Sequence, residues 1–255
     1  MESNANGEVT VFIYMFATAA PGVAQASILP APMALKRMPR REDLGLTKGE
    51  FAVLRRLDSP EKIQRFLFGL RQNFETRGET CYSVRDLLRE RRAHCIEGAL
   101  LAACALWLHG EPPLLMDMKA VNDYDHVVTL FRRNGCWGAI SKTNGIALRW
   151  RDPIYRSLRE LAMSYFHEYY NKRDAKTLRS YSRPFDLRTV KSEEWVTAPK
   201  GAWQLGEKLD AHPHKALITR AQMRALVRRD PFERSIGNLE QYRAPRKKRG
   251  PRKGV

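Results

Sequence analysis

The stretch Cys95 to Leu108 reads CIEGALLAACALWL, and it decides the fold. It is apolar on almost all sides, which predicts a helix buried at the centre of the molecule. Gly110 and Pro112 stop this helix, and the mostly basic string Arg89 to His94 precedes it. We therefore expect Cys95 at the N-terminus of a central helix.

Amphipathic helices are predicted before this stretch. Thr47-Lys-Gly-Glu50 has the form of a capping box, Ser59-Pro60 places an N-cap serine before a first-turn proline, and Ser83 is a third N-cap candidate. Apolar residues at helical spacing follow each of these starts. The part of the chain before the central helix is therefore predicted to be helical.

After Pro113 the pattern becomes that of strands. Leu114 to Met118 and His126 to Phe131 (HVVTLF) read as strands, and Trp137 to Ser141 (WGAIS) follows the two-residue hairpin signal Asn134-Gly135. A further strand is expected from Ile146 to Trp150. This order predicts an α+β fold in which the central helix packs on a small antiparallel sheet.

The patterning predicts four segments along the chain. Helices are expected from Ser157 to Tyr170 and from Thr219 to Arg228, and the chain after residue 171 is otherwise polar. The predicted segments are an N-terminal extension at residues 1–44, a main domain at 45–171, a mostly irregular C-terminal appendage at 172–242 and a basic tail at 243–255.

The N-terminal extension contains an apolar run, VTVFIYMFATAA at residues 9–20, followed by Ala24-Gln25-Ala26, which resembles a signal-peptidase site. A secretory signal also needs a positively charged start, and MESNANGE carries two glutamates instead. The run is shorter than the about 20 apolar residues that span a bilayer. We expect a cytoplasmic protein without a transmembrane segment; export through residues 9–26 as an atypical signal peptide is the alternative.

The chain is strongly basic, with 45 Lys+Arg, 28 Asp+Glu and a formal net charge of +17. Seven of these basic residues lie between Arg243 and Lys253 (RAPRKKRGPRK). Such a tail can neutralise phosphates without reading a sequence, so residues 243–253 are predicted to contact nucleic acid or another polyanion weakly. A hydrophobic content of 43% is that of an ordinary globular protein and argues against a disordered one.

The cysteines form no CxxC pair, and the histidines form no HExxH pattern, so we expect no metal and no cofactor. Cys95 differs from the other cysteines because a helix N-terminus stabilises a thiolate. The unreactive alternative is that Cys95 only packs against or caps its helix. The four cysteines are Cys81, Cys95, Cys104 and Cys136.

His126 is the candidate partner of this thiol because it opens a predicted strand. If Asn134-Gly135 is a two-residue turn, His126 pairs opposite Thr143 and shares a strand face with Ser141. A cysteine at a helix start, a histidine on a strand and a polar residue on the next strand is what thiol-based acyl transfer requires.

Residues 73–144 resemble the transglutaminase-like core of the papain-like cysteine enzymes. The resemblance is carried by three stretches: Arg92-Ala-His-Cys95-Ile-Glu97-Gly-Ala99, Asp123-Tyr-Asp-His126-Val-Val and Gly135-Cys-Trp137-Gly-Ala-Ile-Ser141. It implies a transglutaminase-like fold, Cys95 as nucleophile, His126 as its partner and a peptide or amide as substrate.

One position departs from that family, which carries an aspartate where this chain has Ser141. A hydroxyl cannot stabilise an imidazolium as a carboxylate does. Three interpretations remain open: Ser141 orients the ring as a neutral acceptor, Asn144 takes the role, or the site is impaired. Asp125 is a poor candidate because neighbours on a strand point to opposite faces.

The backbone N–H of Cys95 and a second donor are expected to form the oxyanion hole. Asn73, Arg85 and Arg92 are open candidates for that second donor. His94 is expected to be a neighbour of the nucleophile and not the base, because adjacent side chains on a helix diverge.

The leading hypothesis is a transglutaminase-like cysteine hydrolase or acyltransferase that acts on an amide or peptide bond through Cys95 and His126, with Ser141 or Asn144 in support. The alternative is a catalytically inactive protein of the same fold that binds polyanions through its basic surface and tail. Whether the chain is an enzyme, and its oligomeric state, stay open at this stage.

Overall fold

The computed structural model describes residues 38–76 and 78–245. The signal-like segment at 9–26 and the tail residues 246–255 lie outside them, so the predictions for these parts stay predictions. Within the described ranges, no helix is long and apolar enough to cross a membrane.

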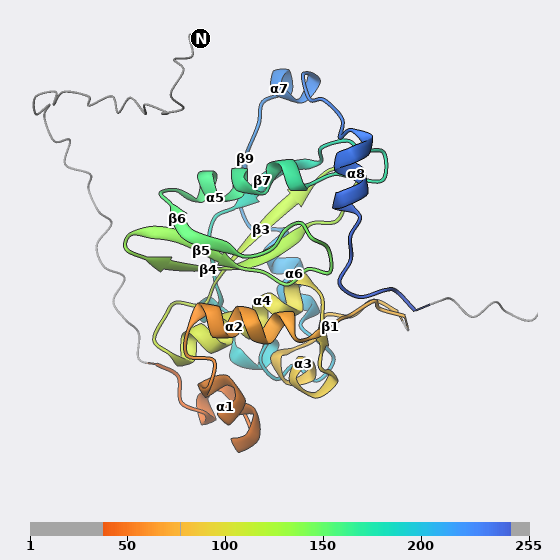
Figure 1. Cartoon of the computed structure of the whole chain (residues 1–255). Helices are drawn as coiled ribbons and strands as arrows, with labels where there is room; N and C mark the ends of the chain where they lie inside the picture. Colours follow the sequence, from red (N-terminus) through yellow and green to blue (C-terminus); the bar gives the residue numbers. More distant parts are fainter. Residues whose placement is uncertain (1–37, 77, 246–255) are drawn as a thin grey trace, which may run out of the picture. The chain divides into compact units, whose positions relative to one another are not determined.

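The structure is an α+β fold, as the sequence predicts, with helices on both faces of one antiparallel sheet (Figure 1). The sheet has the strand order β6-β5-β4-β3-β7-β9, and β8 also pairs with β3. Its strands are β3 (Leu114–Ala120), β4 (His126–Arg133), β5 (Cys136–Ile140), β6 (Arg151–Tyr155), β7 (Leu178–Ser182), β8 (Phe185–Asp186) and β9 (His214–Ala216).

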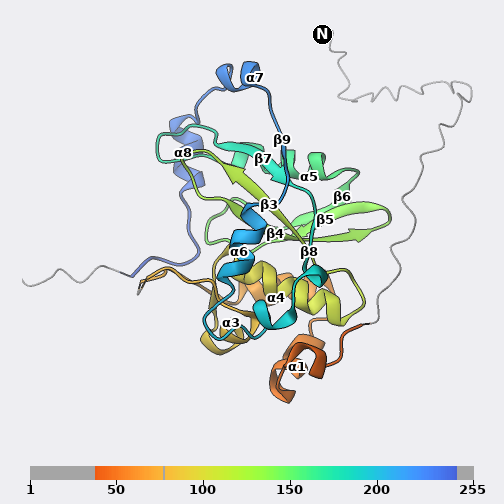
Figure 2. The same cartoon turned by 180° about the vertical axis from the view of Figure 1, so that it is seen from behind.

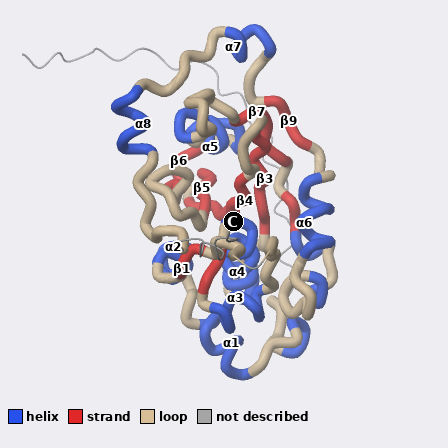
Figure 3. Tube along the Cα trace, turned by 90° about the vertical axis from the view of Figure 1, so that its right-hand side faces the viewer, coloured by secondary structure: helices blue, strands red, loops and turns tan. Residues whose placement is uncertain are grey.

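The first four helices cover one face of this sheet, and Figure 3 shows them together on one side. They are α1 (Lys48–Arg55), α2 (Pro60–Phe68), α3 (Val84–Glu90) and α4 (Cys95–Leu108). The capping box at Thr47 and the N-cap side chains of Ser59 and Ser83 are present as predicted. A small parallel pair, β1 (Arg71–Gln72) and β2 (Arg92–Ala93), lies beside the start of α4.

The central helix is α4, with the predicted bounds, and most of its side chains are buried. It contributes Leu100 and Leu101 to a core shared with the other N-terminal helices and with Leu115 of β3. A second core lies on the other sheet face, where Met116 and Val128 pack with Leu161 of α5 (Leu158–Ser164). Neighbouring residues of β3 therefore enter different cores, as strand alternation requires.

The hairpin of β4 and β5 has the predicted register. Arg133 pairs with Cys136, and pairing continues back to Thr129 and Ile140. Asn134 and Gly135 both have positive φ, at 49° and 80°, which is the backbone of the tight turn that an Asn-Gly pair favours.

The chain after residue 171 corrects the expectation of a mostly irregular appendage. Strand β7 pairs with β3 in the interior of the sheet, and β9 extends the sheet beyond it (Figure 2). Trp195 from the same region is fully buried in the N-terminal core. The polar sequence LRSYS of β7 hides this role because its two core side chains, Leu178 and Tyr181, are three residues apart and do not show the alternation of a strand.

Three further elements differ from their predicted bounds. The strand expected at Ile146 to Trp150 lies at Arg151–Tyr155, and the helix expected up to Tyr170 ends at Ser164, before a 3-10 turn at Phe166–Glu168. The helix expected from Thr219 is the short α7 (Arg220–Arg224). Two helices were not predicted: α6 (Trp203–Asp210) and α8 (Pro231–Gly237).

Candidate active site

Cys95 is the first residue of α4, and its half-buried thiol lines a cleft of about 740 Å³. The preceding residue, His94, is the N-cap and has extended backbone angles of −104° and −168°. The thiol therefore lies where the unpaired N–H groups and the positive end of the helix dipole favour an anion.

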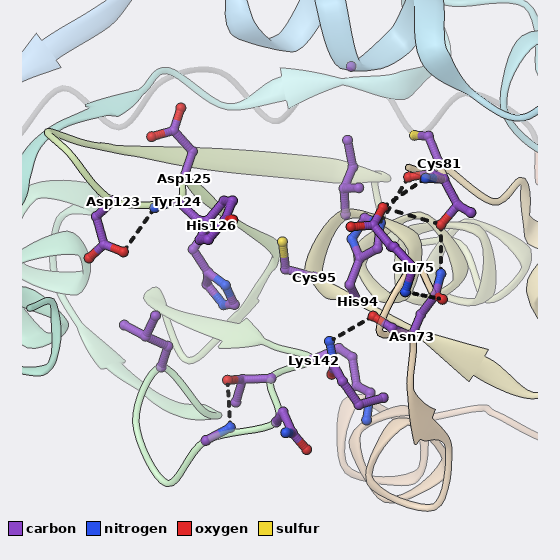
Figure 4. A pocket seen from close by; sticks show the side chains of 18 of the residues that line it. Asn73, Glu75, Cys81, His94, Cys95, Asp123, Tyr124, Asp125, His126 and Lys142 are labelled. Carbon is purple, nitrogen blue, oxygen red and sulfur yellow. Dashed lines mark hydrogen bonds and ion pairs between the residues drawn. The ribbon is translucent and has the colours of Figure 1, made fainter. Parts of the chain in front are cut away.

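His126 is the first residue of β4 and faces Cys95 across the cleft (Figure 4). Its imidazole lies near enough to the thiol to lower the pKa of Cys95. The ring is only 5% exposed, and its Nε2 lies 2.8 Å from the Oγ of Ser141. The structure thus brings together three of the predicted site residues, Cys95, His126 and Ser141.

The orientation of the Ser141 hydroxyl is fixed by the hydrogen bond that it donates. Its Oγ donates to the carbonyl oxygen of Leu148 at 2.5 Å, so its lone pairs are left to accept from Nε2–H of His126. Nδ1 of the imidazole then remains available for the thiol. As a neutral acceptor, Ser141 favours the tautomer of His126 that carries its proton on Nε2, but it lacks the negative charge of a carboxylate.

The backbone of Ser141 is held by helix α2. Its N–H donates to Oε1 of Gln64 at 2.9 Å, and its carbonyl accepts from Nε2 of the same side chain at 2.7 Å. Gln64 is itself buried. This two-bond clamp positions the hydroxyl against the imidazole ring although Ser141 lies just beyond the end of β5.

A second histidine contacts the thiol. Burial opposes charge on the ring of His94, but its hydrogen bond to Cys95, the charge of that sulfur and the carboxylate of Glu97 raise the pKa of His94 to about 9. Burial likewise opposes a thiolate at Cys95, yet hydrogen bonds from His126 and His94 hold the pKa of the thiol well below its ordinary value. The resulting arrangement is a thiolate at Cys95 beside a protonated ring of His94, with the imidazole of His126 on its other side.

Glu97 connects the start of α4 to the loop that precedes α3. Its fully buried carboxylate accepts hydrogen bonds from the backbone N–H groups of His94 and Tyr82 at 2.9 Å, and from Oγ1 of Thr80 at 2.9 Å. Nδ2 of Asn73 donates to both of its oxygens at 3.1 Å. Nε2 of His94 lies 3.3 Å from the same group.

Asn144 lines the cleft but is bonded elsewhere, so it does not take the place of the missing aspartate. Its Oδ1 accepts from the backbone N–H of Tyr242 at 3.0 Å, and its Nδ2 donates to the carbonyl oxygen of Tyr242 at 2.9 Å. The partner is 98 residues away in sequence, and this long-range pairing is invisible in the local pattern around Asn144.

Two of the three candidates for the second oxyanion donor, Arg85 and Arg92, do not line the cleft. Arg85 pairs with Glu50 at 2.8 Å, and Arg92 pairs with Glu90 at 2.9 Å. Asn73 lines the cleft, but its amide is committed to Glu97. Gln72 lines the cleft as well; its Nε2 makes one long bond of 3.3 Å to the carbonyl oxygen of Asn73. It is the side-chain amide that the sequence reasoning missed.

The expectation that the side chain of His94 diverges from that of Cys95 is wrong, because the ring interacts with the thiol. Adjacent side chains diverge within a helix, but His94 is an N-cap with an extended backbone, so the rule does not apply to it. The signal for this role was available in the sequence, because Glu97 three residues later is the position from which a side chain bonds back to an N-cap.

One group of described side chains has a spacing that a metal ion requires. One carboxylate oxygen each from Asp117, Asp125 and Asp210 lie within 4.8 Å of one another. Asp210 already pairs with the ammonium of Lys119 at 2.6 Å, and Asp117 bonds to Nε2 of His214 at 3.0 Å. Lys119 and His214 therefore already interact with two of the three carboxylates that a metal ion would need.

No protein-family model matches this chain, and no curated protein matches it either. A half-buried thiolate with a histidine on one side, a second histidine beside it and the N–H groups of a helix start behind it can attack a carbonyl carbon and transfer protons during the reaction.

Proposed function

We propose that this protein is a transglutaminase-like cysteine hydrolase or acyltransferase that acts on an amide or peptide bond. The observation that carries the proposal is the arrangement at the start of α4, where the thiol of Cys95 faces the imidazole of His126 and that ring is hydrogen-bonded to the hydroxyl of Ser141. The resemblance of residues 73–144 to the transglutaminase-like core agrees with this order.

In the proposed reaction the thiolate sulfur of Cys95 attacks the carbonyl carbon and forms a tetrahedral oxyanion. The proton on His126 passes to the leaving amine, and the carbon–nitrogen bond breaks to leave a thioester on Cys95. Water or an amine, deprotonated by His126, then attacks the thioester and releases the acyl group, which restores the thiolate.

The oxyanion would be stabilised by the backbone N–H of Cys95 at the helix N-terminus, with the side-chain amide of Gln72 as the second donor. Ser141 takes the orienting position as a neutral acceptor. The second imidazolium, His94, supplies positive charge to the thiolate, which compensates for part of the charge that an aspartate behind His126 would otherwise provide.

The test is the reactivity of Cys95 towards iodoacetamide at pH 7, located by peptide mapping. We expect labelling of one equivalent at Cys95, about tenfold or more faster than a free thiol, since a thiol of ordinary pKa is only a few per cent ionised at this pH. His126→Ala is expected to abolish the acceleration. Cys136, which is also half-buried, is the internal reference cysteine.

Labelling of Cys95 no faster than that of a free thiol, or unchanged labelling in His126→Ala, would contradict the proposal. Thermal unfolding of each variant separates a lost hydrogen bond from a lost fold. Ser141→Ala provides a graded comparison, because it removes the acceptor of His126 and leaves the thiol and both rings in place.

A further inference from the structure

The lining of the cleft has the opposite charge to the chain as a whole. The chain carries a formal net charge of +17, yet the described cleft lining holds six carboxylates and a single lysine. That lysine, Lys142, is 1% exposed, and its Nζ is directed at the carbonyl oxygen of Leu70 at 2.8 Å. The six acidic residues are Glu75, Glu79, Asp123, Asp125, Glu168 and Glu207.

Four of these carboxylates accept hydrogen bonds or pair with neighbours. Asp123 accepts from Oγ1 of Thr177 at 2.8 Å, and Asp125 accepts from the backbone N–H of Ala120 at 2.8 Å. Glu168 pairs with Arg151 at 2.6 Å, and Glu75 accepts from the backbone N–H of Thr80 at 2.7 Å and lies 3.6 Å from His94. Glu79, Asp123, Asp125 and Glu207, here called the acidic rim, form no ion pair with any described cation.

The rim lies on two sides of the nucleophile. In Figure 4, Asp123 and Asp125 lie beyond His126, and Glu75 from the loop that also carries Glu79 lies on the opposite side of Cys95. Helix α6 adds Glu207 to the lining. The end of α6 lies beside the connection between β3 and β4, because carboxylate oxygens of Asp125 and Asp210 are within 4.8 Å of each other.

Two exposed aromatic side chains accompany the rim. Trp203 precedes Glu207 by one helical turn, so both point from the same face of α6 into the cleft, and the indole is 44% exposed. Tyr124, between the two aspartates, lines the cleft and is 91% exposed. Large aromatic faces beside unpaired carboxylates are the combination that binds ammonium and guanidinium groups.

Resting on the proposed function, we infer that the acyl donor taken by Cys95 carries a positive charge close to its scissile carbonyl, such as a lysine or arginine side chain held by the acidic rim, Trp203 and Tyr124. An anionic donor is repelled by the same carboxylates and by the thiolate. The rim therefore sets the substrate class, while Cys95 and His126 perform the chemistry.

The test uses acetylated amino-acid chloromethyl ketones, in which the sulfur of Cys95 displaces chloride and forms a thioether. Lysine and norleucine derivatives differ in the terminal ammonium group, and a glutamate derivative reverses the charge. We expect the lysine reagent to inactivate the thiol about tenfold faster than norleucine, because several exposed ion pairs of the usual strength act together. The advantage should shrink as salt screens the rim.

The variant Glu79→Gln/Glu207→Gln is expected to lower the lysine-to-norleucine rate ratio about fivefold, since each exposed charge pair contributes modestly. The side-chain carboxylates of both residues have no described hydrogen-bond partner, so the fold should be preserved. The matched control is Glu61→Gln/Glu193→Gln, two exposed glutamates away from the cleft, which makes the same change in net charge and should leave the ratio unchanged.

Iodoacetamide separates the two proposals because it is neutral and small. Rapid labelling of Cys95 by iodoacetamide together with equal rates for the lysine and norleucine reagents would overturn the inference about charge and leave the thiol chemistry intact. Slow labelling by iodoacetamide would overturn the proposed function itself. An equal loss of the rate ratio in the control variant would assign the effect to net charge and also overturn the role of the rim.

Discussion

At the scale of single residues, the reactivity of this protein depends on two histidines that reach one sulfur from different elements. His126 comes from the start of β4, and His94 is the N-cap of the helix that carries Cys95. Each ring has a second partner that fixes it: Oγ of Ser141 for His126, and the carboxylate of Glu97 for His94. Both imidazole rings beside the thiolate are therefore positioned by further interactions with neighbouring side chains.

The contribution of His94 can be measured from the pH dependence of Cys95 alkylation. The lowered pKa of the thiol means that the rate reaches its plateau well below pH 9. In His94→Asn the thiolate loses one imidazolium, so the midpoint of the profile should move up by about one pH unit. His167→Asn, at an exposed ring outside the cleft, is the control. An unmoved midpoint in His94→Asn would remove this histidine from the site.

Lys142 gives a second prediction that depends on pH. Its burial, and then the charge of Arg149, lower the pKa of its ammonium from 10.5 to about 8. Between pH 8 and 10.5 the unfolded chain keeps a proton that the folded chain has lost, so this group raises stability as pH rises through that window. Relative to wild type, Lys142→Met should lose up to about 1.4 kcal/mol per pH unit there.

The measurement for Lys142 is the free energy of urea unfolding of wild type and Lys142→Met at pH 7.5, 8.5 and 9.5. Lys200→Met, at an exposed lysine outside the cleft, is the matched control. If the difference in the free energy of unfolding between wild type and Lys142→Met is the same at all three pH values, burial of this ammonium does not disfavour its charged form.

At the scale of elements, the close approach of α4 to the end of β5 keeps the site together. A Cβ placed on Gly98 would lie 2.5 Å from Cβ of Lys142, the residue after Ser141. Gly98→Ala is therefore expected to push this segment away from the helix, to destabilise the fold by about 1–3 kcal/mol and to slow Cys95 labelling.

Gly49→Ala is the control for that substitution, because a Cβ at Gly49 in helix α1 meets nothing within 4 Å. Alanine there should be neutral or stabilise by about 0.5–1 kcal/mol through its better helix propensity. The two alanines are compared by thermal unfolding and iodoacetamide rates. A Gly98→Ala protein as stable and reactive as wild type would show that the contact with Lys142 is not tight.

The elements that could be predicted are those whose information is local. The bounds of α4 and the register of the β4–β5 hairpin are read from apolar periodicity and from Asn134-Gly135. That register in turn brings His126 to Ser141. The bonding of Asn144 to Tyr242 and the pairing of β7 with β3 could not be predicted, because each joins segments far apart in the sequence without a pattern of its own.

At the scale of the whole molecule, acidic residues of the cleft and basic residues of the tail come from different parts of the chain. The cleft lining is acidic, whereas seven basic residues lie in the segment 243–253. The residues just before it bind the cleft loop, because the backbone of Tyr242 bonds to Asn144 and the N–H of Gln241 donates to its carbonyl oxygen at 2.8 Å. Polyanion binding and thiol chemistry are thus expected to be separable.

Deletion of residues 243–255 tests this separation. A protein that ends at Tyr242 should keep its unfolding temperature and its Cys95 labelling rate. It should lose its affinity for a single-stranded 20-mer oligonucleotide. In the full chain this affinity is expected to fall steeply as the salt concentration rises. Fluorescence anisotropy at two salt concentrations is sufficient. If the affinity survives the deletion, the tail is not the polyanion-binding segment.

The position of β3 in the sheet has a consequence for how the chain is made. Strand β3 (LLMDMKA) has β4 on one side, and its other edge is covered only by β7 and β8, which come about 60 residues later. A nascent or truncated chain that stops before Leu178 presents a long apolar strand with unpaired N–H and C=O groups, which can recruit the same strand of another copy. Strands β7 and β8, which are synthesised after β3, therefore protect this edge from aggregation.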